Sequence, residues 1–476
     1  MKEKKANTGS LISIAVAVLI VTTVFIAQAS TVTVNSKDLD KDFSQSLEAN
    51  VPEGFSIATT GDMMLTHPVP HSSNPGFVGL LNGIKNAEVA FTNFESSLID
   101  MRHFSGFAQA ISDSLRPLSS PGVAADLKNM GFDMVSLAGN HSADYGPEGM
   151  LETRQRLDQV GIVHAGTGKN LSSAGATRYL DSTPGRIGLI AITTTFDDVA
   201  KAMDSLGEAP GRPGVNGLKL RREVHVDSKT MSALHGLKAS LPEGSTQPDS
   251  MDDTLMLLGV TYREGKKFGF DYKMDQKDLA RILKSVHQGK LNSDFLVVSI
   301  HSHEPGSWSE EPANFLPELA RSLVDSGADI VVGHGPHILR GIEIYQGKPI
   351  FYSLGNFIFQ ISSQGPLAYD IYRKLRGEPE DFTDAELLQK RIGPYVEKDA
   401  WYESVIAVTK FSDGSFSEIE LYPLELNLDK PMANRGIPQL ASEEVAKKIL
   451  NRLVRLSENF GTEVEIQGAK GIIRNR

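Results

Sequence analysis

The sequence predicts an α/β protein with a largely parallel sheet, and two observations support this fold class. Short apolar runs alternate with helical segments along most of the chain. This alternation is typical of βαβ units, in which helices cover the faces of a parallel sheet. Several of the apolar runs also end directly in Asp, Glu, Asn or His. The length of 476 residues suits one large α/β domain with insertions, or two domains.

The N-terminal segment predicts export from the cytoplasm. Three lysines in the first five residues precede an uncharged, mostly apolar run over residues 11–27, and Ala27-Gln28-Ala29 has the small-x-small pattern of a signal cleavage site. The run also lies at the short edge of a membrane span, so residues 1–29 are a signal peptide or an uncleaved membrane anchor. Both interpretations place the rest of the chain outside the cytoplasm, in the periplasm or at the cell surface. The polar stretch 30–53 is then a linker.

The composition limits the classes of partner and of cofactor site that this chain can have. The formal net charge is -11 with a pI near 5.6, and no basic run is present, so we expect no nucleic-acid partner. A polyanionic substrate is still compatible with a local cationic site. The chain has no cysteine, which excludes disulfides, a thiolate nucleophile and Cys-type zinc sites. Any metal would therefore be bound by nitrogen and oxygen ligands.

The expected elements follow from apolar patterns and from Gly and Pro punctuation. Strands are expected at residues 55–60, 88–92, 132–137, 161–164, 186–193, 295–300, 328–332 and 349–352, with a hairpin at 404–411 and 416–422. Helices are expected at 77–86, 120–131, 147–160, 276–287, 312–326 and 442–460. Residues 195–274 and 360–400 interrupt this rhythm and are interpreted as insertions, the first a candidate cap over the site.

The stretch Gly333-His334-Gly335-Pro336-His337 places two imidazoles on the turn that leaves an apolar strand. Neutral imidazole nitrogens in this arrangement can bind one cation. Other strand ends carry similar side chains, and these are Asp62, Glu95, Asn140, His141, His301, His303 and Asn356. Because ligands bind outside the carboxyl ends of the strands in an open α/β sheet, we expect these side chains to converge on one metal centre.

Each candidate also has an ordinary structural interpretation. These are a turn for Asp62, Asn140 and His141, an ion pair for Glu95, and a spectator role for His301 or His303. Asp144, close behind His141, could orient a ligand as readily as bind the metal. Arg212 is a candidate for binding a substrate carboxylate or phosphate, since its planar fork suits two oxygens, but it could also be a surface arginine.

Several of these motifs together resemble a known family. The motifs are Gly61-Asp-Met-Met-Leu65, Asn93-Phe-Glu95, Gly139-Asn-His-Ser-Ala-Asp-Tyr-Gly146, Arg212-Pro-Gly-Val-Asn216, Gly333-His-Gly-Pro-His337 and Tyr352-Ser-Leu-Gly-Asn-Phe357. In this order, from about residue 56 to 426, they resemble the bacterial capsule-synthesis CapA proteins, also called poly-γ-glutamate synthesis proteins. That family is similar to the calcineurin-like metallophosphoesterases.

The resemblance implies a four-layer α/β sandwich over residues 54–430. The two insertions and the tail at 431–476 lie outside the match, and the amphipathic pattern of residues 442–460 predicts that this tail is helical. It also implies one or two divalent ions (Mn, Fe, Zn or Mg). The implied metal ligands are Asp62, Glu95, Asn140, His301, His303, His334 and His337. Asp62 and His141 would be catalytic, with His141 as the general acid, and Arg212 and Asn356 would bind substrate.

This chain departs from the phosphoesterase pattern at one motif and from the family's pattern at three. The family's usual Asn-Asn-His and Gly-His-His-Pro-His are here Gly139-Asn140-His141 and Gly333-His334-Gly335-Pro336-His337. Phosphoesterases carry Asp-x-His at the first motif, where this chain has Asp62-Met63-Met64, so the number of ions stays open. The family's usual His-Trp-Gly-x-Glu run is here His301-Ser302-His303-Glu304. His303 is therefore a candidate replacement ligand.

The leading hypothesis for function is an exported, membrane-associated metal-dependent enzyme of the CapA type. It would act in the synthesis, release or attachment of an anionic surface polymer such as poly-γ-glutamate, with membrane-bound synthase subunits as partners. One alternative is a non-catalytic subunit of a polymer synthesis and export complex, which the absence of a histidine at position 64 favours and the retained histidines disfavour. Another is a general phosphoesterase.

Overall fold

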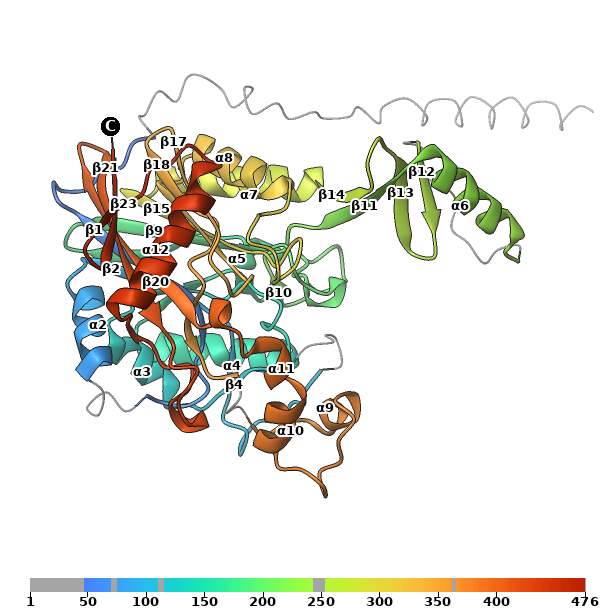
Figure 1. The fold of residues 1–476 in the computed structure, drawn as a ribbon, viewed down its shortest axis with the longest axis horizontal. Coiled ribbons are helices and arrows are strands. Elements are labelled where there is room, and N and C mark those ends of the chain that lie inside the picture. Colours follow the sequence, from blue (N-terminus) through green and yellow to red (C-terminus); the bar gives the residue numbers. More distant parts are fainter. Residues whose placement is uncertain (1–46, 70–74, 110–114, 243–252, 362–364, 476) are drawn as a thin grey trace, which may run out of the picture. The chain divides into compact units, whose positions relative to one another are not determined.

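A computed structural model describes residues 47–475 except 70–74, 110–114, 243–252 and 362–364. Two large sheets dominate this part of the chain (Figure 1). The first has ten strands in the order β23-β24-β21-β20-β1-β2-β5-β6, with β19 beside β1 and β22 beside β21. The second has six strands in the order β17-β18-β16-β15-β9-β8.

The strands of the ten-stranded sheet come from both ends of the described chain. Their bounds are β1 Ser56–Met64, β2 Val89–Phe94, β5 Met134–Ser136, β6 Val163–Ala165, β19 Asn356–Phe359, β20 Glu403–Ser412, β21 Ser415–Glu425, β22 Gln439–Leu440, β23 Glu465–Gln467 and β24 Lys470–Arg474. The six-stranded sheet comes from the middle. Its strands are β8 Arg178–Ser182, β9 Gly185–Thr193, β15 Phe295–His301, β16 Ile330–His334, β17 Ile342–Tyr345 and β18 Lys348–Phe351.

Alternating side chains divide the core into an inner layer and two outer layers. In β1, Ile57 packs between the two sheets whereas Ala58 packs toward helices on the outer face. In β9, Leu189 packs between the sheets and Ile190 packs outward against other helices. This period of two is what a strand with both faces buried requires. The expected four-layer α/β sandwich with insertions is therefore confirmed.

Each outer layer is formed by amphipathic helices. Helices α2 (Pro75–Lys85), α3 (Val123–Met130) and α4 (Gly146–Gln159) cover the ten-stranded sheet, and α7 (Gln276–Leu291) and α8 (Phe315–Asp325) cover the six-stranded sheet. Helix α7 shows why these segments are helical. The Asp275 side chain caps its N-terminus by accepting from the backbone N–H groups of Lys277 and Asp278, and Ile282 and Val286 form its buried face.

A buried ionic cluster joins the second sheet to its helices. The Asp329 carboxylate accepts from the Lys290 ammonium at 2.8 Å, from the Lys348 ammonium at 2.9 Å and from the backbone N–H of Leu296 at 2.8 Å. Asp329 is fully buried and both lysines are nearly so. Removing the carboxylate would leave two ammonium groups without a counterion in the interior.

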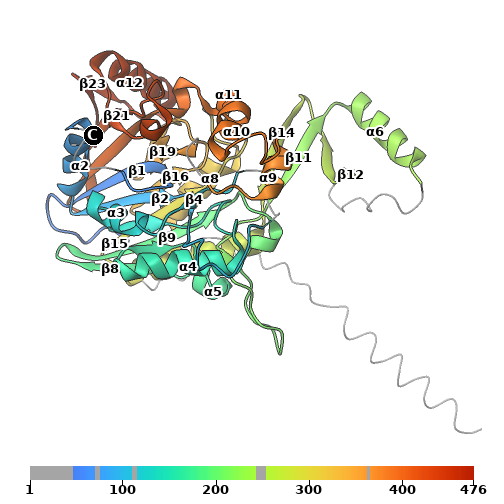
Figure 2. The ribbon, with the colours of Figure 1, turned by 90° about the horizontal axis from the view of Figure 1, so that it is seen from below.

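Two regions lie outside the four layers, both within the expected insertions. Strands β11 (Leu220–Val226), β12 (Thr254–Leu257), β13 (Val260–Glu264) and β14 (Gly269–Met274) form a separate sheet with helix α6 (Ser228–Ser240), all green in Figures 1 and 2. They enclose a small core of their own. Helices α9 (Tyr369–Lys374), α10 (Asp384–Arg391) and α11 (Gly393–Val396) form the second region.

The short elements are β3 Ser97–Leu98, β4 Leu118–Ser119, β7 Thr167–Gly168, β10 Gly214–Val215 and α5 Leu171–Ala174. They connect the larger elements. Strands β3 and β4 pair with each other, as do β7 and β10.

The C-terminal segment differs from the expected helical tail. Helix α12 (Glu443–Glu458) is capped by Ser442 and packs Ile449, Leu450 and Leu453 into the inner core. It is followed by β23 and β24, and β24 pairs with β21. Through this pairing the segment completes the ten-stranded sheet. The side chain of Ile473 in β24 packs into the inner core.

Membrane attachment remains an expectation from the sequence. Within the part of the chain that the structure describes, every helix is too short or too polar to cross a bilayer. The apolar run 11–27 on which the expectation rests lies outside the described residues.

Candidate metal centre

Four parallel strands end at the site, β1 and β2 in one sheet and β15 and β16 in the other. Asn93 joins the two sheets. Its Nδ2 donates to Oδ1 of Asp62 at 2.9 Å and lies 3.2 Å from Nδ1 of His301. Asp62 and Asn93 are register neighbours in the parallel pair β1–β2, so their side chains share a face of the sheet.

Glu95, which follows β2, lies at the centre of the cluster. Among the described residues, neither of its buried carboxylate oxygens has a hydrogen-bond partner. Its Oε1 is surrounded by imidazole Nε2 atoms, at 3.7 Å for His301, 3.8 Å for His303, 3.8 Å for His337 and 4.0 Å for His141. Ligands around one ion at about 2.1 Å are themselves roughly 3–3.5 Å apart. A small contraction would therefore turn this shell into a coordination sphere.

The charge state of Glu95 depends on whether a cation is bound nearby. Burial raises the pKa of Glu95 to about 8; His337 opposes this change and Asp62 reinforces it. Without a cation nearby, the carboxyl group is mostly protonated at neutral pH. A divalent ion would supply the charge that stabilises the buried carboxylate.

Asp62 is the opposite case, a fully buried carboxylate with partners on both oxygens. Oδ1 accepts from Asn93, Oδ2 accepts from the backbone N–H of Gly335 at 2.9 Å, and Nδ1 of His337 lies 3.5 Å from Oδ2. Burial alone would raise the pKa of Asp62, but His337, His334 and His301 lower it well below the usual aspartate range. Asp62 is therefore ionised and available to a cation.

His301, His303 and Asn140 form the side of the cluster next to Glu95. Nε2 of His301 lies 2.8 Å from Oδ1 of Asn140 and 3.1 Å from Nε2 of His303. Burial lowers the pKa of both imidazoles, to about 4 for His303. The rings are therefore neutral, which is the form that binds metals. A cation among these atoms would displace the proton from any ring nitrogen that it binds.

His141 is held by a buried aspartate behind it. Nδ1 of His141 donates to Oδ2 of Asp144 at 2.7 Å, and Nε2 points toward Glu95. Burial alone would lower the pKa of His141, but the charge and hydrogen bond of Asp144, with the charge of Glu95, raise it. The ring can therefore hold a proton on Nε2, facing the cluster. Asp144 takes the orienting role that the sequence left open.

The turn after β16 places His337 but not His334 against Glu95. His337 has a positive φ of 61°, and Asn356 fixes its tautomer. The Asn356 amide donates to the carbonyl of Trp401 at 2.9 Å, so its oxygen accepts from Nδ1 of His337 at 3.0 Å. This leaves the Nε2 lone pair of His337 directed at the cluster. Asn356 thus positions a candidate ligand instead of presenting its own amide to a substrate.

His334 differs from the expected ligand role. It is the last residue of β16, and its Nε2 donates to the backbone carbonyl of Thr60 at 3.1 Å while its Nδ1 accepts from the Ser299 hydroxyl at 3.3 Å. Both ring nitrogens are therefore engaged within the protein. The ring packs edge-on against Phe91, so it connects the two sheets behind the cluster.

Arg212 also differs from its expected role. Its side chain is exposed, and its guanidinium donates to the backbone carbonyls of Lys201 at 3.0 Å and Asp198 at 3.1 Å. These contacts stabilise the loop that contains it. They do not direct it at the cluster.

Two further residues contribute to the site without having been identified from the sequence. Asn93 could have been found, because it lies near the end of β2, two residues before Glu95, and the period of two of an extended backbone places both side chains on one face. Trp401 could not. Its ring lies 4.9 Å from that of His337 at an angle of 31°, yet it belongs to a short 3-10 helix, Asp399–Trp401, far along the chain.

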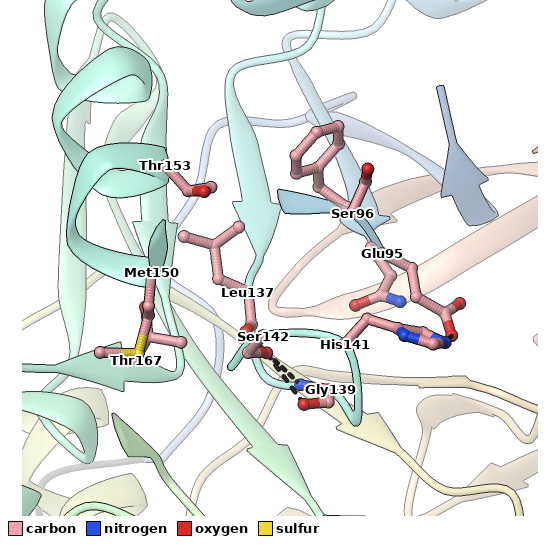
Figure 3. Close-up of a pocket in the computed structure, with 11 residues that line it drawn as sticks. Glu95, Ser96, Leu137, Gly139, His141, Ser142, Met150, Thr153 and Thr167 are labelled. Carbon is pink, nitrogen blue, oxygen red and sulfur yellow. Dashed lines mark hydrogen bonds and ion pairs between the residues drawn. The ribbon is translucent and has the colours of Figure 1, made fainter. Parts of the chain in front are cut away.

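Cavities adjoin the cluster on two sides. One lies behind Glu95 and His141 and is lined by Leu137, Met150 and Thr153 among others. Figure 3 shows the ring of His141 beside the Glu95 carboxylate at its edge. The other cavity has a volume of about 760 Å³ including its opening to solvent, and Asn140, His141, His303 and His337 form one wall of it. Substrate could reach the cluster through this second cavity.

The donor set fits a divalent ion. Two groups of side chains each bring three ligand atoms within 4.8 Å of one another, Glu95 with His303 and His337, and Asp62 with Glu95 and His301. Two carboxylates and three imidazoles suit Mn, Fe or Zn better than a purely oxygen-binding ion. The fold and site thus define a four-layer α/β protein with a histidine–carboxylate cluster at the carboxyl ends of its strands.

Comparison with known proteins identifies the family. Residues 56–361 match the bacterial capsule synthesis protein PGA_cap, and the chain belongs to this family. Protein y4sH of Sinorhizobium fredii is 43% identical over 444 residues, covering 91% of this chain and 96% of that protein. The capsule biosynthesis protein CapA of Bacillus anthracis is 24% identical over 314 residues, covering 64% and 60%. The resemblance to CapA proteins is therefore confirmed.

A solved structure also aligns with the fold. The NAD nucleotidase of Haemophilus influenzae superposes with a TM-score of 0.32 at 13% identity, covering 84% of this chain and 62% of that one. The family assignment rests on the sequence match alone.

Proposed function

We propose that this chain is an exported metal-dependent hydrolase or transferase that acts on an anionic surface polymer such as capsular poly-γ-glutamate. Membership of the capsule-synthesis family supports the polymer, as do relatives described as capsule and PGA biosynthesis proteins. Membrane-bound synthase subunits are its expected partners. The observation that carries the catalytic part is Glu95, whose two buried oxygens accept no hydrogen bond from the residues that the structure describes and lie inside a shell of imidazoles.

The residues would divide the work as follows. Asp62, Glu95, His301, His303 and His337 would hold the ion. When bound, a divalent ion supplies Lewis-acid polarisation of a carbonyl or phosphoryl oxygen and lowers the pKa of a nearby water.

His141 would supply the proton. In a hydrolysis, water adds its hydroxyl to the carbonyl carbon or phosphorus, and the leaving group departs with a proton from Nε2 of His141. Asp144 keeps that ring in place and favours its protonated form. The proton released by the attacking water then restores His141.

Metal analysis of the purified chain tests this proposal. We expect about one divalent ion per chain after loading with Mn²⁺, and Mn²⁺-dependent hydrolysis of γ-glutamyl peptides or aryl phosphates. Glu95→Gln should abolish both. His103→Ala is the matched control, because His103 is an exposed histidine whose partner Asp100 lies outside the cluster. A chain that binds no divalent ion would contradict the catalytic proposal.

A second candidate is a non-catalytic subunit of a polymer synthesis complex. The observation that favours it is Met64, which lines the cavity where the resemblance to phosphoesterases implies a histidine. Polymer production in cells separates the two candidates. A Glu95→Gln strain should lose polymer if the chain is an enzyme, and should keep it if only the folded subunit is required.

A further inference from the structure

The cavity in front of the cluster has two walls of different chemistry. Asn140, His141, His303 and His337 form the polar wall. The opposite wall comes from helices α9 to α11 and the residues around them. These helices are drawn in orange in Figure 2.

The opposite wall is apolar. Ile371, Leu375, Ile392 and Val396 line it, and the last three are only partly buried. Their remaining exposed surface therefore faces a cavity that is open to the cluster. Trp401 lies between the two walls, since it lines the cavity and packs on the ring of His337. An apolar group placed against this wall would be removed from water within reach of the cluster.

The charges around the cavity argue against a polyanionic occupant. Among the described lining residues, Lys374 is the only one with an ammonium or guanidinium group, and none carries a carboxylate. A poly-γ-glutamate segment has one free carboxylate per residue. Burying several of these against isoleucine and leucine would cost several kcal/mol each without compensating partners. The apolar wall therefore suits an uncharged chain, and an anionic group could lie at the histidine cluster on the other wall when a divalent ion is bound there.

We infer that the cavity binds the apolar group of an amphiphilic substrate with a single phosphate or carboxylate headgroup, and that this headgroup lies at the histidine cluster. This rests on the proposed function, since the reacting bond would lie where the ion binds. For a phosphate headgroup, the enzyme would then hydrolyse the P–O bond to the alkyl or aryl chain: water adds its hydroxyl to phosphorus, and the alcohol leaves with a proton from His141. A carboxylate headgroup would bind at the cluster without a bond to cleave between it and its chain. On an anionic surface polymer, this places the reaction at an end that carries such an ester and not within the repeating part.

The two tryptophans of the chain allow a direct binding test. In a Trp308→Phe protein, Trp401 in the cavity is the remaining tryptophan, and its fluorescence reports occupancy. Ethyl, butyl and hexyl phosphate, the matching alkanoates and tri-γ-glutamate would be titrated into the Mn²⁺-loaded full-length chain, with calorimetry on the same samples. We expect affinity to rise up to about fourfold per methylene, as hydrophobic transfer predicts. The phosphate and alkanoate series identify the headgroup.

Two matched substitutions test whether the dependence of affinity on chain length arises at the apolar wall. Leu375→Glu should weaken hexyl phosphate at least about tenfold and leave ethyl phosphate within about threefold, since it removes the apolar contact for the longer chain. Leu237→Glu is the control, because Leu237 is exposed on α6 and does not line the cavity. Equal binding of ethyl and hexyl phosphate in the Trp308→Phe chain, or tighter binding of tri-γ-glutamate, would overturn the inference.

These results stay separate from the proposed function. If chain-length dependence is present but no substrate is turned over, the cavity is as inferred and the catalytic proposal fails. If Mn²⁺-dependent hydrolysis occurs without chain-length dependence, the catalytic proposal stands and the inference about the cavity fails.

Discussion

Replacing Glu95 by Gln should stabilise the metal-free protein at alkaline pH while abolishing its response to metal. Glutamine keeps the shape of the side chain and removes its charge. In the metal-free chain the folded-state pKa of Glu95 is about 8, against an ordinary value of 4.5. The unfolded chain therefore loses this proton at lower pH than the folded chain does, so folding stability falls as pH rises from 4.5 to about 8.

The size of the effect follows from the same two values. Their difference corresponds to about 5 kcal/mol of stability lost above pH 8. For a folded part of this length, the entropy of unfolding is about 0.9 kcal/mol/K, so the loss is worth roughly 5 °C in Tm. Glu95→Gln removes the loss, and its Tm in EDTA should exceed that of the parent at pH 8.5 and match it at pH 4.5.

Added Mn²⁺ should reverse the order of the two Tm values at pH 8.5, so that the parent becomes more stable than Glu95→Gln. The parent gains RT ln(1 + [L]/Kd) of stability from the ion, about 4 kcal/mol at a thousandfold excess over Kd. Glu95→Gln should gain little, because an amide oxygen cannot balance the charge of the ion. The assay is thermal unfolding followed by circular dichroism at the two pH values, in EDTA and in Mn²⁺.

Glu223→Gln is a control for which we expect the change in stability at pH 8.5 to have the opposite sign. Glu223 is also a fully buried glutamate, but its oxygens pair with Arg221 at 2.7 Å and Arg263 at 2.9 Å. Glu223→Gln should destabilise the chain at pH 8.5 and leave the Mn²⁺ response intact. If Glu95→Gln also lowers the Tm of the metal-free chain, then Glu95 has a counterion that the structure does not show, and the argument for a cation site is refuted.

Three further predictions concern single residues. Asp144→Asn should lower kcat about 10- to 100-fold with unchanged metal content. It should also move the fall in activity at alkaline pH to lower pH. The reason is that the mutation lowers the pKa of His141, and the protonated ring of His141 is the proton donor. His164→Gln should flatten the loss of stability between pH 6.5 and 4 in urea titrations, since burial lowers the pKa of His164 to about 4 and the unfolded chain takes up a proton first; an unchanged slope would contradict this. Asp329→Ala should cost about 3–5 kcal/mol in urea unfolding because it strands two buried ammonium groups, whereas Asp181→Ala, which breaks an exposed pair, should cost less than about 1 kcal/mol.

Much of the fold could be predicted because it depends on local patterns. Apolar runs of strand length, helix caps and glycine stops are written in short windows. They place ten of the sixteen strands of the two main sheets and the helices that cover them, and they miss β8, β17, β19, β22, β23 and β24. The exceptions are instructive. Strand β24 is a short C-terminal segment whose neighbour β21 lies some 50 residues earlier in the chain. Its pairing depends on that distant partner and not on its own pattern.

The candidate site divides in the same way. Which residue types gather was predictable, because parallel strands bring their carboxyl ends to one edge and the side chains there are Asp, Glu, Asn and His. Which ring nitrogens face the cluster was not. His334 and His337 are three residues apart in one motif, yet Thr60 and Ser299 engage the first while Asn356 turns the second toward Glu95.

The sequence by itself determined the layered α/β architecture, the family and the set of candidate donors, because each is encoded in local pattern or in motif order. Only the tertiary structure decided that Glu95 is the central carboxylate, with no hydrogen bond from the described residues, that His334 faces away and Arg212 supports a loop, and that an apolar wall faces the cluster. Each of these depends on atoms contributed by segments distant in sequence. Burial and hydrogen-bond partners set the charge and direction of a side chain, and they exist only once the sheets have packed together.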